Sequence, residues 1–344
     1  MIESELSAFA NYMKSKEETK FYFFVAPNYE DRSRGLVEFV VRLPEDIREK
    51  VEVVVIKLQS QNYKVNVLED IKVHQYKSVI SQLRSKQITI HEKEISYPDR
   101  YSSISIEHLH KDYIKANGEV VFDFSCFPKL MIIDICKVFL KKGVHQKFSF
   151  TYSSPEKYPQ IRYPQAIGEL RGILENKPLG KLLQDHDEGT LINFPSDLGY
   201  SGHLISDQVS RYSDFDQYLF VFMRRRFPFL AYEAMAGNIH LLGEAYREWR
   251  NKVINHFTIQ DGYRKLEEIV DALCGKLSSN ENKHIVIFSP FGPKPLTVGC
   301  YLMTKKLKDH GIESEILQES SFQYSSVYSI GLGKTYLFEI EMHE

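Results

Sequence analysis

The sequence predicts an α/β fold of two tandem Rossmann-like units with mainly parallel sheets, in which the second unit has extra helices. Two observations lead to this prediction. Apolar runs rich in β-branched and aromatic residues alternate with helical segments, as in right-handed βαβ crossovers. In addition, the two halves of the chain repeat short features in the same order. The length of 344 residues suits two domains of ordinary size.

The first half alternates strands and helices, and we assign residues 1–153 to the first unit. Its first strand, KFYFFVA, is a continuous apolar run that is typical of a strand buried on both faces. Strands are expected at 20–26, 51–58, 87–91, 119–124 and 148–152. Helices are expected over about 33–43, 66–84, 104–115 and 128–142.

The second unit is expected at 189–344, after a connection rich in proline and charge at about 154–188. Its strands are expected at 190–194, 218–223, 284–288, 313–317 and 335–340. Residues 229–279 are predicted to be a mainly helical insertion. Between the last two strands, the glycines of 331–334 favour a hairpin turn over a phosphate-binding loop.

The internal repeat consists of several matches in the same order. After the first strand of each half, Pro, Ser, Leu and Val recur with one spacing, at 27, 33, 36 and 41 and at 195, 201, 204 and 209. A second match joins the turns 125–129 (SCFPK) and 289–294 (SPFGPK), each after an apolar strand. Ligands of open α/β sheets bind beyond the carboxyl ends of the strands, near the topological switch point. The loops after strands one and four of each half therefore form the candidate site.

The first of these loops combines carboxylates, guanidinium groups and a hydroxyl. Arg32 has the chemistry to hold a phosphate bidentately, and Ser33 to cap the next helix and add a hydrogen bond. If the chain is an enzyme, Glu30 and Arg32 are its candidate catalytic residues. The alternative is an ordinary helix N-terminus, in which the acidic side chains and Ser33 satisfy free N–H groups. The second copy retains Ser201 but lacks the Glu-Asp-Arg set.

The other loop places polar groups at a strand-to-helix turn. Asp123, Ser125 and Lys129 follow the fourth strand of the first half, and Ser289 and Lys294 are their counterparts in the second half. Amide groups at a helix N-terminus favour an anion, and each lysine adds a positive charge. The alternative is that the proline in each turn only begins the helix and the lysines are solvated.

This second loop resembles a known ligand-binding signature. The residues D-x-S-x-x-x-K-x-M, from Asp123 to Met131, resemble the D-x-[ST]-G-G-T-K-x-M signature of CRISPR-associated Rossmann fold (CARF) domains. Two such halves in one chain are similar to the SAVED sensors of antiviral signalling. The resemblance implies that Asp123, Ser125 and Lys129, and more loosely Ser289 and Lys294, bind an oligonucleotide second messenger. The sequence departs from the signature where Cys-Phe-Pro replaces Gly-Gly-Thr.

A further segment resembles the R-N-x4-H motif of HEPN ribonucleases. It contains Arg250, Asn251 and His256. The resemblance implies that Arg250 stabilises a phosphate and that His256 assists proton transfer. The alternative is an Arg and a His that occur six residues apart by chance on a charged helix.

Composition excludes several other classes. The net charge of −2 argues against broad, non-specific nucleic-acid binding. The 4 cysteines are scattered, without CxxC or zinc-ligand spacing, and we expect them to be buried in a reducing compartment. No signal peptide or apolar stretch of about 20 residues is present, which predicts a soluble, cytoplasmic protein with no membrane partner. Because dinucleotide-binding, Walker A and zinc-protease motifs are absent, we expect no cofactor and no metal.

The leading functional hypothesis is a nucleotide- or oligonucleotide-binding sensor or regulatory protein in antiviral defence. The alternative is an enzyme that acts on a nucleotide or nucleic acid, either a nucleotide hydrolase or a ribonuclease. A third class is a structural partner of a separate effector protein. The sequence leaves the ligand, the effector partner and homo-oligomerisation open.

Overall fold

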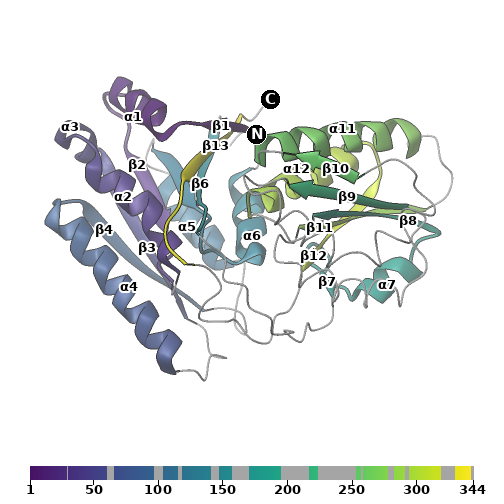
Figure 1. Ribbon diagram of the computed structural model, residues 1–344, viewed down its shortest axis with the longest axis horizontal. Helices are drawn as coiled ribbons and strands as arrows, with labels where there is room; N and C mark the ends of the chain where they lie inside the picture. The colour runs from purple at the N-terminus through teal and green to yellow at the C-terminus, as the bar shows by residue number, and fades with distance from the viewer. Residues whose placement is uncertain are drawn as a thin grey trace. The chain divides into compact units, whose positions relative to one another are not determined.

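A computed structural model shows two compact units, of which unit 1 contains residues 1–159 and 325–344 and unit 2 contains residues 160–324 (Figure 1). The structure describes residues 1–28, 30–59, 66–96, 104–114, 118–140, 147–156, 170–194, 217–223, 253–256, 259–277, 283–290, 294–318 and 330–341.

Unit 1 contains a 7-stranded sheet in the order β1-β13-β6-β5-β2-β3-β4. The strands β2 to β6 are parallel to their neighbours in this group. They span Phe21–Val25, Val51–Gln59, Thr89–Ser96, Glu119–Asp123 and Lys147–Ser153. Beyond β6, the antiparallel strands β13 (Thr335–Glu341) and β1 (Ile2–Ser4) extend the sheet.

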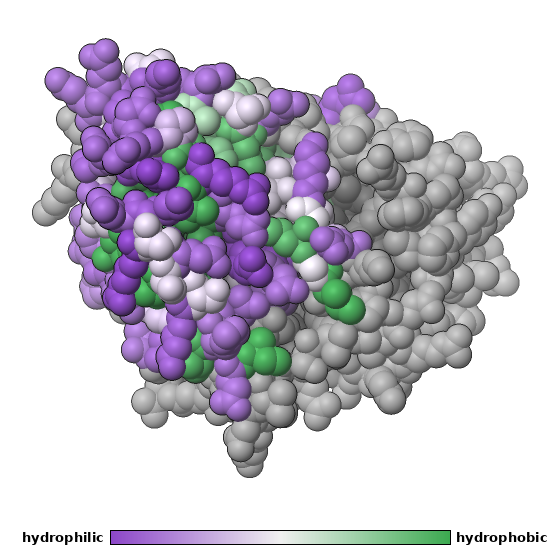
Figure 2. Space-filling model, turned by 60° about the vertical axis from the view of Figure 1, so that its left-hand side comes forward, coloured by the Kyte–Doolittle hydropathy of each residue, from purple (hydrophilic) through white to green (hydrophobic). Residues whose placement is uncertain are grey.

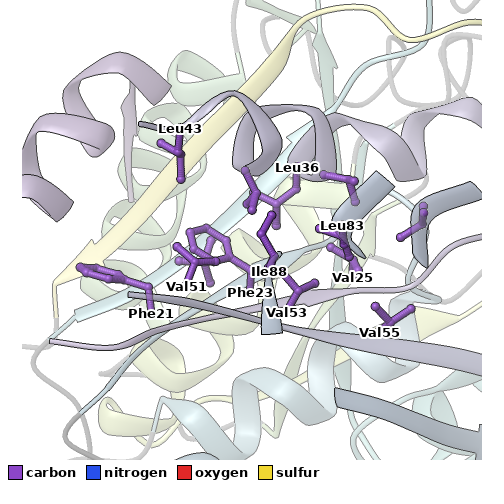
Figure 3. Close-up of a cluster of buried hydrophobic side chains, with 14 of the residues drawn as sticks. Phe21, Phe23, Val25, Leu36, Leu43, Val51, Val53, Val55, Leu83 and Ile88 are labelled. Carbon is purple, nitrogen blue, oxygen red and sulfur yellow. The ribbon is translucent and has the colours of Figure 1, made fainter. Parts of the chain in front are cut away.

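Helices cover both faces of this sheet. The helices of unit 1 are α1 (Leu6–Ser15), the 3-10 helix η1 (Asp31–Arg34), α2 (Gly35–Arg42), α3 (Glu45–Arg48), α4 (Asn66–Ser85), α5 (Ile104–Ile114) and α6 (Lys129–Phe139). Alternate residues of a strand point to opposite faces, and β2 shows this directly. Phe23 packs in a cluster with side chains of α1, α2 and α4, as Figure 3 shows for part of the cluster. Phe24 instead contacts Tyr113 of α5 and Phe139 of α6.

The burial of β2 on both faces explains its sequence. All five residues of β2 are buried, which confirms the prediction made from its continuous apolar run. Burying one Phe or Val side chain stabilises a fold by about 1.5–3 kcal/mol. Because β2 packs apolar side chains against the helices on both faces of the sheet, its burial stabilises both of these contacts.

Unit 2 contains a 6-stranded sheet in the order β10-β9-β8-β11-β12-β7. The strands β8 to β12 are parallel to their neighbours and span Glu188–Phe194, Gln217–Met223, Val253–His256, His284–Pro290 and Glu313–Gln318. The short β7 (Arg171–Gly172) pairs antiparallel with β12. The described helices of unit 2 are α7 (Leu179–Gln184), α11 (Ile259–Leu277) and α12 (Lys294–Asp309).

The parallel strands of the two units have the same order. Numbered along the chain within each unit, they lie as third, second, first, fourth and fifth: β4-β3-β2-β5-β6 and β10-β9-β8-β11-β12. This is the doubly wound arrangement, in which the strand order reverses between the first and fourth strands. The structure thus confirms the α/β fold with two mainly parallel sheets, and the shared order agrees with the proposed duplication.

Several predicted boundaries differ from the structure. Residues 325–344, expected in the second unit, belong to unit 1, because β13 pairs with β6 and β1. The expected connection 154–188 contains β7 and α7, and the expected helical insertion contains strand β10 as well as α11. The predicted hairpin at 331–334 is wrong, because β12 and β13 lie in different sheets.

The surface and the cysteines complete this description. Hydrophilic side chains dominate the described face of unit 1 in Figure 2. All four cysteines are buried and free of disulfides, as predicted. In the described part of the chain, no helix combines the length and apolar character that crossing a membrane requires.

Candidate functional site

The predicted loops of unit 1 lie at the switch point of its sheet. β2 and β5 are adjacent and parallel, so the loops that follow them leave from the same edge. The loop after β2 contains Glu30, Arg32 and Ser33, and the loop after β5 contains Ser125. The structure therefore brings together side chains about a hundred residues apart, at the edge where open α/β sheets bind ligands.

The guanidinium group of Arg32 is engaged within the chain. It forms an ion pair with the carboxylate of Glu30, and the two side chains are 3% and 6% exposed. Arg32 Nη1 also donates a hydrogen bond to the hydroxyl of Tyr152, at 3.3 Å, and its guanidinium lies 5.8 Å from the centre of that ring. Breaking such a buried pair leaves one charge without compensation. The described contacts therefore give Arg32 and Glu30 a role in fixing the first loop.

Ser33 and Asp31 also act within this loop. Ser33 lies in η1, and its hydroxyl donates a hydrogen bond to the carbonyl oxygen of Glu30, at 2.9 Å. The expectation that Ser33 caps the following helix is wrong, because the N-cap of α2 is Arg34. The carboxylate of Asp31 accepts hydrogen bonds from Gln75 of α4 and from the backbone N–H of Gly331, both at 3.2 Å.

The loop after β5 is held by Asp123 and Ser125. The Asp123 carboxylate accepts hydrogen bonds from the backbone N–H of Ser125, at 3.0 Å, and from the Ser125 hydroxyl. The Ser125 hydroxyl oxygen in turn accepts a hydrogen bond from the N–H of Ser153 at the end of β6, at 2.8 Å. Both Asp123 and Ser125 are buried. Asp123 and Ser125 thus shape the turn and tie it to the neighbouring strand.

Lys129 and Lys294 occupy equivalent positions in the two units. Lys129 is the first residue of α6, after the N-cap Pro128, and Lys294 is the first residue of α12. Both are partly exposed. Each lysine therefore stands where a helix N-terminus follows the fourth strand of its sheet, which is the predicted context for anion binding.

Buried hydroxyl groups without a partner among the described residues occur at the switch point of unit 2 and on β6 of unit 1. Ser289, near the end of β11, and Thr297, in the first turns of α12, are fully buried, and their hydroxyls have no hydrogen-bond partner in the described part of the chain. In unit 1 the same holds for Thr151, which is aligned with Asp123 in the β5–β6 register. A buried unsatisfied polar group costs about 1–3 kcal/mol, so each such group has unused hydrogen-bonding capacity.

Other predicted residues are not brought into this arrangement. Ser201 and Arg250 lie outside the described residues. His256 ends strand β10, so the prediction that the RN-x4-H segment forms a helix is wrong at that residue. Strand β10 is an edge strand that pairs with β9, and β9 and β8 separate it from β11.

An open groove of about 730 Å³ lies elsewhere, along α4 and β4 of unit 1. Its charged lining is partly paired, because Arg84 and Glu92 approach to 3.4 Å. β4 is the edge strand and is separated from the switch point by β3. The groove is therefore separate from the candidate site. Its lining residues are Tyr76, Lys77, Ile80, Ser81, Arg84, Ser85 and Glu92.

The sequence did not identify several residues that complete the site. Tyr152 contacts Arg32, and Thr335 Oγ1 lies 2.9 Å from Ser153 Oγ. Gly35, the first residue of α2, packs directly against this hydroxyl pair. Ser153 was visible only as part of the internal repeat. Nothing in the sequence near Thr335 indicates that it joins a site formed by the first half.

Comparisons with known proteins add little to the geometry. No family model matches this chain, and no curated protein matches its sequence. The chain is similar to a functionally unknown protein from Pseudomonas aeruginosa PAO1, with 9% identity, a TM-score of 0.24, and coverage of 89% of this chain and 93% of that chain. It is also similar to a universal stress protein from Archaeoglobus fulgidus DSM 4304, with 7% identity, a TM-score of 0.24, and coverage of 86% and 95%. At these values the similarities carry no functional argument, and the fold description rests on the strand order.

Proposed function

We propose that this protein is a nucleotide- or oligonucleotide-binding sensor that holds its ligand at the strand-end loops of its units. The observation that supports this most strongly is the unused hydrogen-bonding capacity at the switch point of unit 2 and beside that of unit 1. Ser289 and Thr297 of unit 2 and Thr151 on β6 of unit 1 have buried hydroxyls that find no partner among the described residues. Phosphate and base oxygens are suitable acceptors for such hydroxyl groups.

The charges near these hydroxyls favour an anionic ligand. Lys129 and Lys294 each begin the helix that follows a fourth strand. A phosphate at that position would interact with a lysine ammonium group, with backbone N–H groups at the start of the helix and with the positive end of the helix dipole. The net charge of −2 makes such a local site more plausible than a broad nucleic-acid surface.

The ligand class in this proposal comes from the resemblance to CARF domains. Asp123, Ser125 and Lys129 occupy a strand, a turn and the start of a helix, as that signature requires. The resemblance extends the proposal to oligonucleotide second messengers and to antiviral defence. A separate effector protein would then respond to the bound state.

The described geometry favours binding over catalysis. A nucleotide hydrolase or ribonuclease requires a general base or a nucleophile within reach of the substrate. Glu30 and Arg32 bind each other and are 5% and 2% exposed, which directs both groups inward. We therefore assign them a structural role in the first loop within this proposal.

A thermal-shift screen tests the proposal. The full chain is heated with mononucleotides, linear oligonucleotides and cyclic oligonucleotides, and at least one of them should raise the melting temperature. The shift should be lost in the double variant Lys129→Ala, Lys294→Ala. The matched control is Lys86→Ala, Lys308→Ala, which removes one exposed lysine from each unit away from the switch points and should keep the shift. The absence of any shift in the unmodified protein would contradict the proposal.

A further inference from the structure

The polar residues at the switch point of unit 1 form a connected network that reaches the C-terminal strand. Asp123 binds Ser125, the Ser125 hydroxyl accepts the N–H of Ser153, and Ser153 Oγ lies 2.9 Å from Thr335 Oγ1. Ser153 is fully buried, and Thr335 lies 182 residues further along the chain. The strands β5, β6 and β13 are thereby linked through the side chains of Asp123, Ser125, Ser153 and Thr335.

The first loop reaches the same region by two other routes. Arg32, which is paired with Glu30, contacts Tyr152, the residue before Ser153. Asp31 accepts the N–H of Gly331, four residues before Thr335, at 3.2 Å. Hydrogen bonds therefore connect both ligand loops of unit 1 to the end of β6 or to the residues just before β13.

Unit 2 is inserted in the chain between β6 and β13 of unit 1. The chain leaves unit 1 after residue 159, shortly beyond β6, and re-enters it at residue 325, shortly before β13. The residues just after β6 and just before β13 are hydrogen-bonded to each other: the N–H of Ser154 donates to the carbonyl oxygen of Lys334 at 3.0 Å, and the carbonyl oxygen of Ser154 accepts the N–H of Gly333 at 2.8 Å.

We propose that this network is a relay, which couples the ligand loops of unit 1 to the end of β6 and the start of β13, between which unit 2 is inserted in the chain. The inference rests on the proposed function, because the relay has a purpose only if the loops bind a ligand. A ligand that displaced the loop after β5 would alter the bond from Ser153 to Ser125 and, through Ser153, the contact with Thr335. Coupling of this kind can be carried by a contiguous set of packed or hydrogen-bonded groups, and the network supplies one.

Hydrogen exchange of the full chain tests the relay without a ligand. Ser125→Ala removes the acceptor of the Ser153 N–H, which is worth about 1 kcal/mol or about fivefold in exchange rate. We expect exchange to accelerate by about that factor at Ser153, and also at Ser154 and Gly333, which the substitution does not touch. Acceleration confined to residues 124–128 and 153 would overturn the relay.

Two controls separate coupling from general destabilisation. Val79→Ala creates a cavity in the core of unit 1 away from the network. Its acceleration of exchange at Ser154 should be no greater than its acceleration of exchange in β3. Thr335→Val should accelerate exchange at the Ser125 N–H, whereas Thr335→Ser keeps the hydroxyl and should not. Equal effects of Thr335→Val and Thr335→Ser would also overturn the relay. Failure of the thermal-shift screen would instead refute the proposed function, because the exchange measurements use no nucleotide.

Discussion

Gly35 lies directly against the side chain of Ser153: a Cβ atom on Gly35 would come within 1.9 Å of Ser153 Oγ and 2.6 Å of Thr335 Oγ1. Both of these atoms belong to short side chains that are hydrogen-bonded to each other, so they have little room to move. Because Gly35 has no side chain, the first residue of α2 leaves the space in which Ser153 of β6 contacts Thr335 of β13.

Gly35→Ala should destabilise the protein by about 1–3 kcal/mol, the usual cost of overpacking a core. Chemical unfolding measures this change. Gly275→Ala is the matched control, because Gly275 lies within α11 with no atom within 4 Å of an added Cβ. Alanine there should stabilise the protein by about 0.5–1 kcal/mol through helix propensity. If both substitutions stabilised it, the close packing at Gly35 would be refuted.

Arg32→Met should destabilise the protein by about 3–5 kcal/mol, because it leaves the buried carboxylate of Glu30 without its partner. Arg42→Met is the comparison, since Arg42 is 78% exposed and pairs with Glu38 at the surface. Its loss should cost less than about 1 kcal/mol. Equal costs for the two variants, measured by denaturant unfolding, would show that Arg32 is not held as described.

Thr297→Val should raise the free energy of unfolding by about 1 kcal/mol in the absence of ligand, because it removes a buried hydroxyl that has no partner. Thr190→Val is the control of opposite sign. The Thr190 hydroxyl lies 2.9 Å from Nε2 of His284, and its loss should destabilise the protein by about 1 kcal/mol. Destabilisation by Thr297→Val would mean that this hydroxyl already has a partner and is not available for a ligand.

Glu315 should make the stability of the protein depend on pH. Its carboxylate accepts the N–H groups of Leu174, Glu175 and Ile316, but burial raises its pKa above the ordinary value of 4.5. The folded state then binds the proton more tightly than the unfolded state. The resulting stabilisation is fully present below the unfolded pKa and is lost as pH rises through the higher folded pKa.

Unfolding free energies of the wild type and Glu315→Gln, compared between about pH 4 and pH 7, measure this effect. The difference between the unfolding free energy of the wild type and that of Glu315→Gln, in favour of the wild type, should shrink as pH rises. Glu45→Gln, which removes a carboxylate at an exposed position of α3, is measured in parallel as the surface control. A wild-type advantage that grew with pH would reverse the assigned direction of the pKa shift.

The sequence predicted those parts of the fold and site that depend on local patterns. The apolar run of β2 indicated a strand buried on both faces, and the turn after β5 was recognised because a hydroxyl, a proline and a lysine follow a buried strand. Strand order then brought the loops after β2 and β5 to one edge. All of these inferences use residues that are neighbours in the chain or obey a general rule of parallel sheets.

The parts that were not predicted depend on contacts between distant residues. Nothing near Thr335 distinguishes a strand of the second sheet from one that pairs with β6, because an apolar strand suits either place. The sequence 28–34 is equally compatible with an exposed Arg32 that binds phosphate and with one that pairs with Glu30. The structure pairs Arg32 with Glu30 and adds a hydrogen bond to Tyr152, on a strand far along the chain that the local sequence does not reveal.

The most direct test of the central proposal is equilibrium binding of the nucleotide that gives the largest thermal shift. Its dissociation constant should rise at least about tenfold, or about 1.4 kcal/mol, in the double variant Lys129→Ala, Lys294→Ala. It should stay unchanged in Lys86→Ala, Lys308→Ala, and binding should weaken with salt as expected for phosphate contacts. Equal affinity in both double variants would contradict the assignment of the ligand to the switch-point loops.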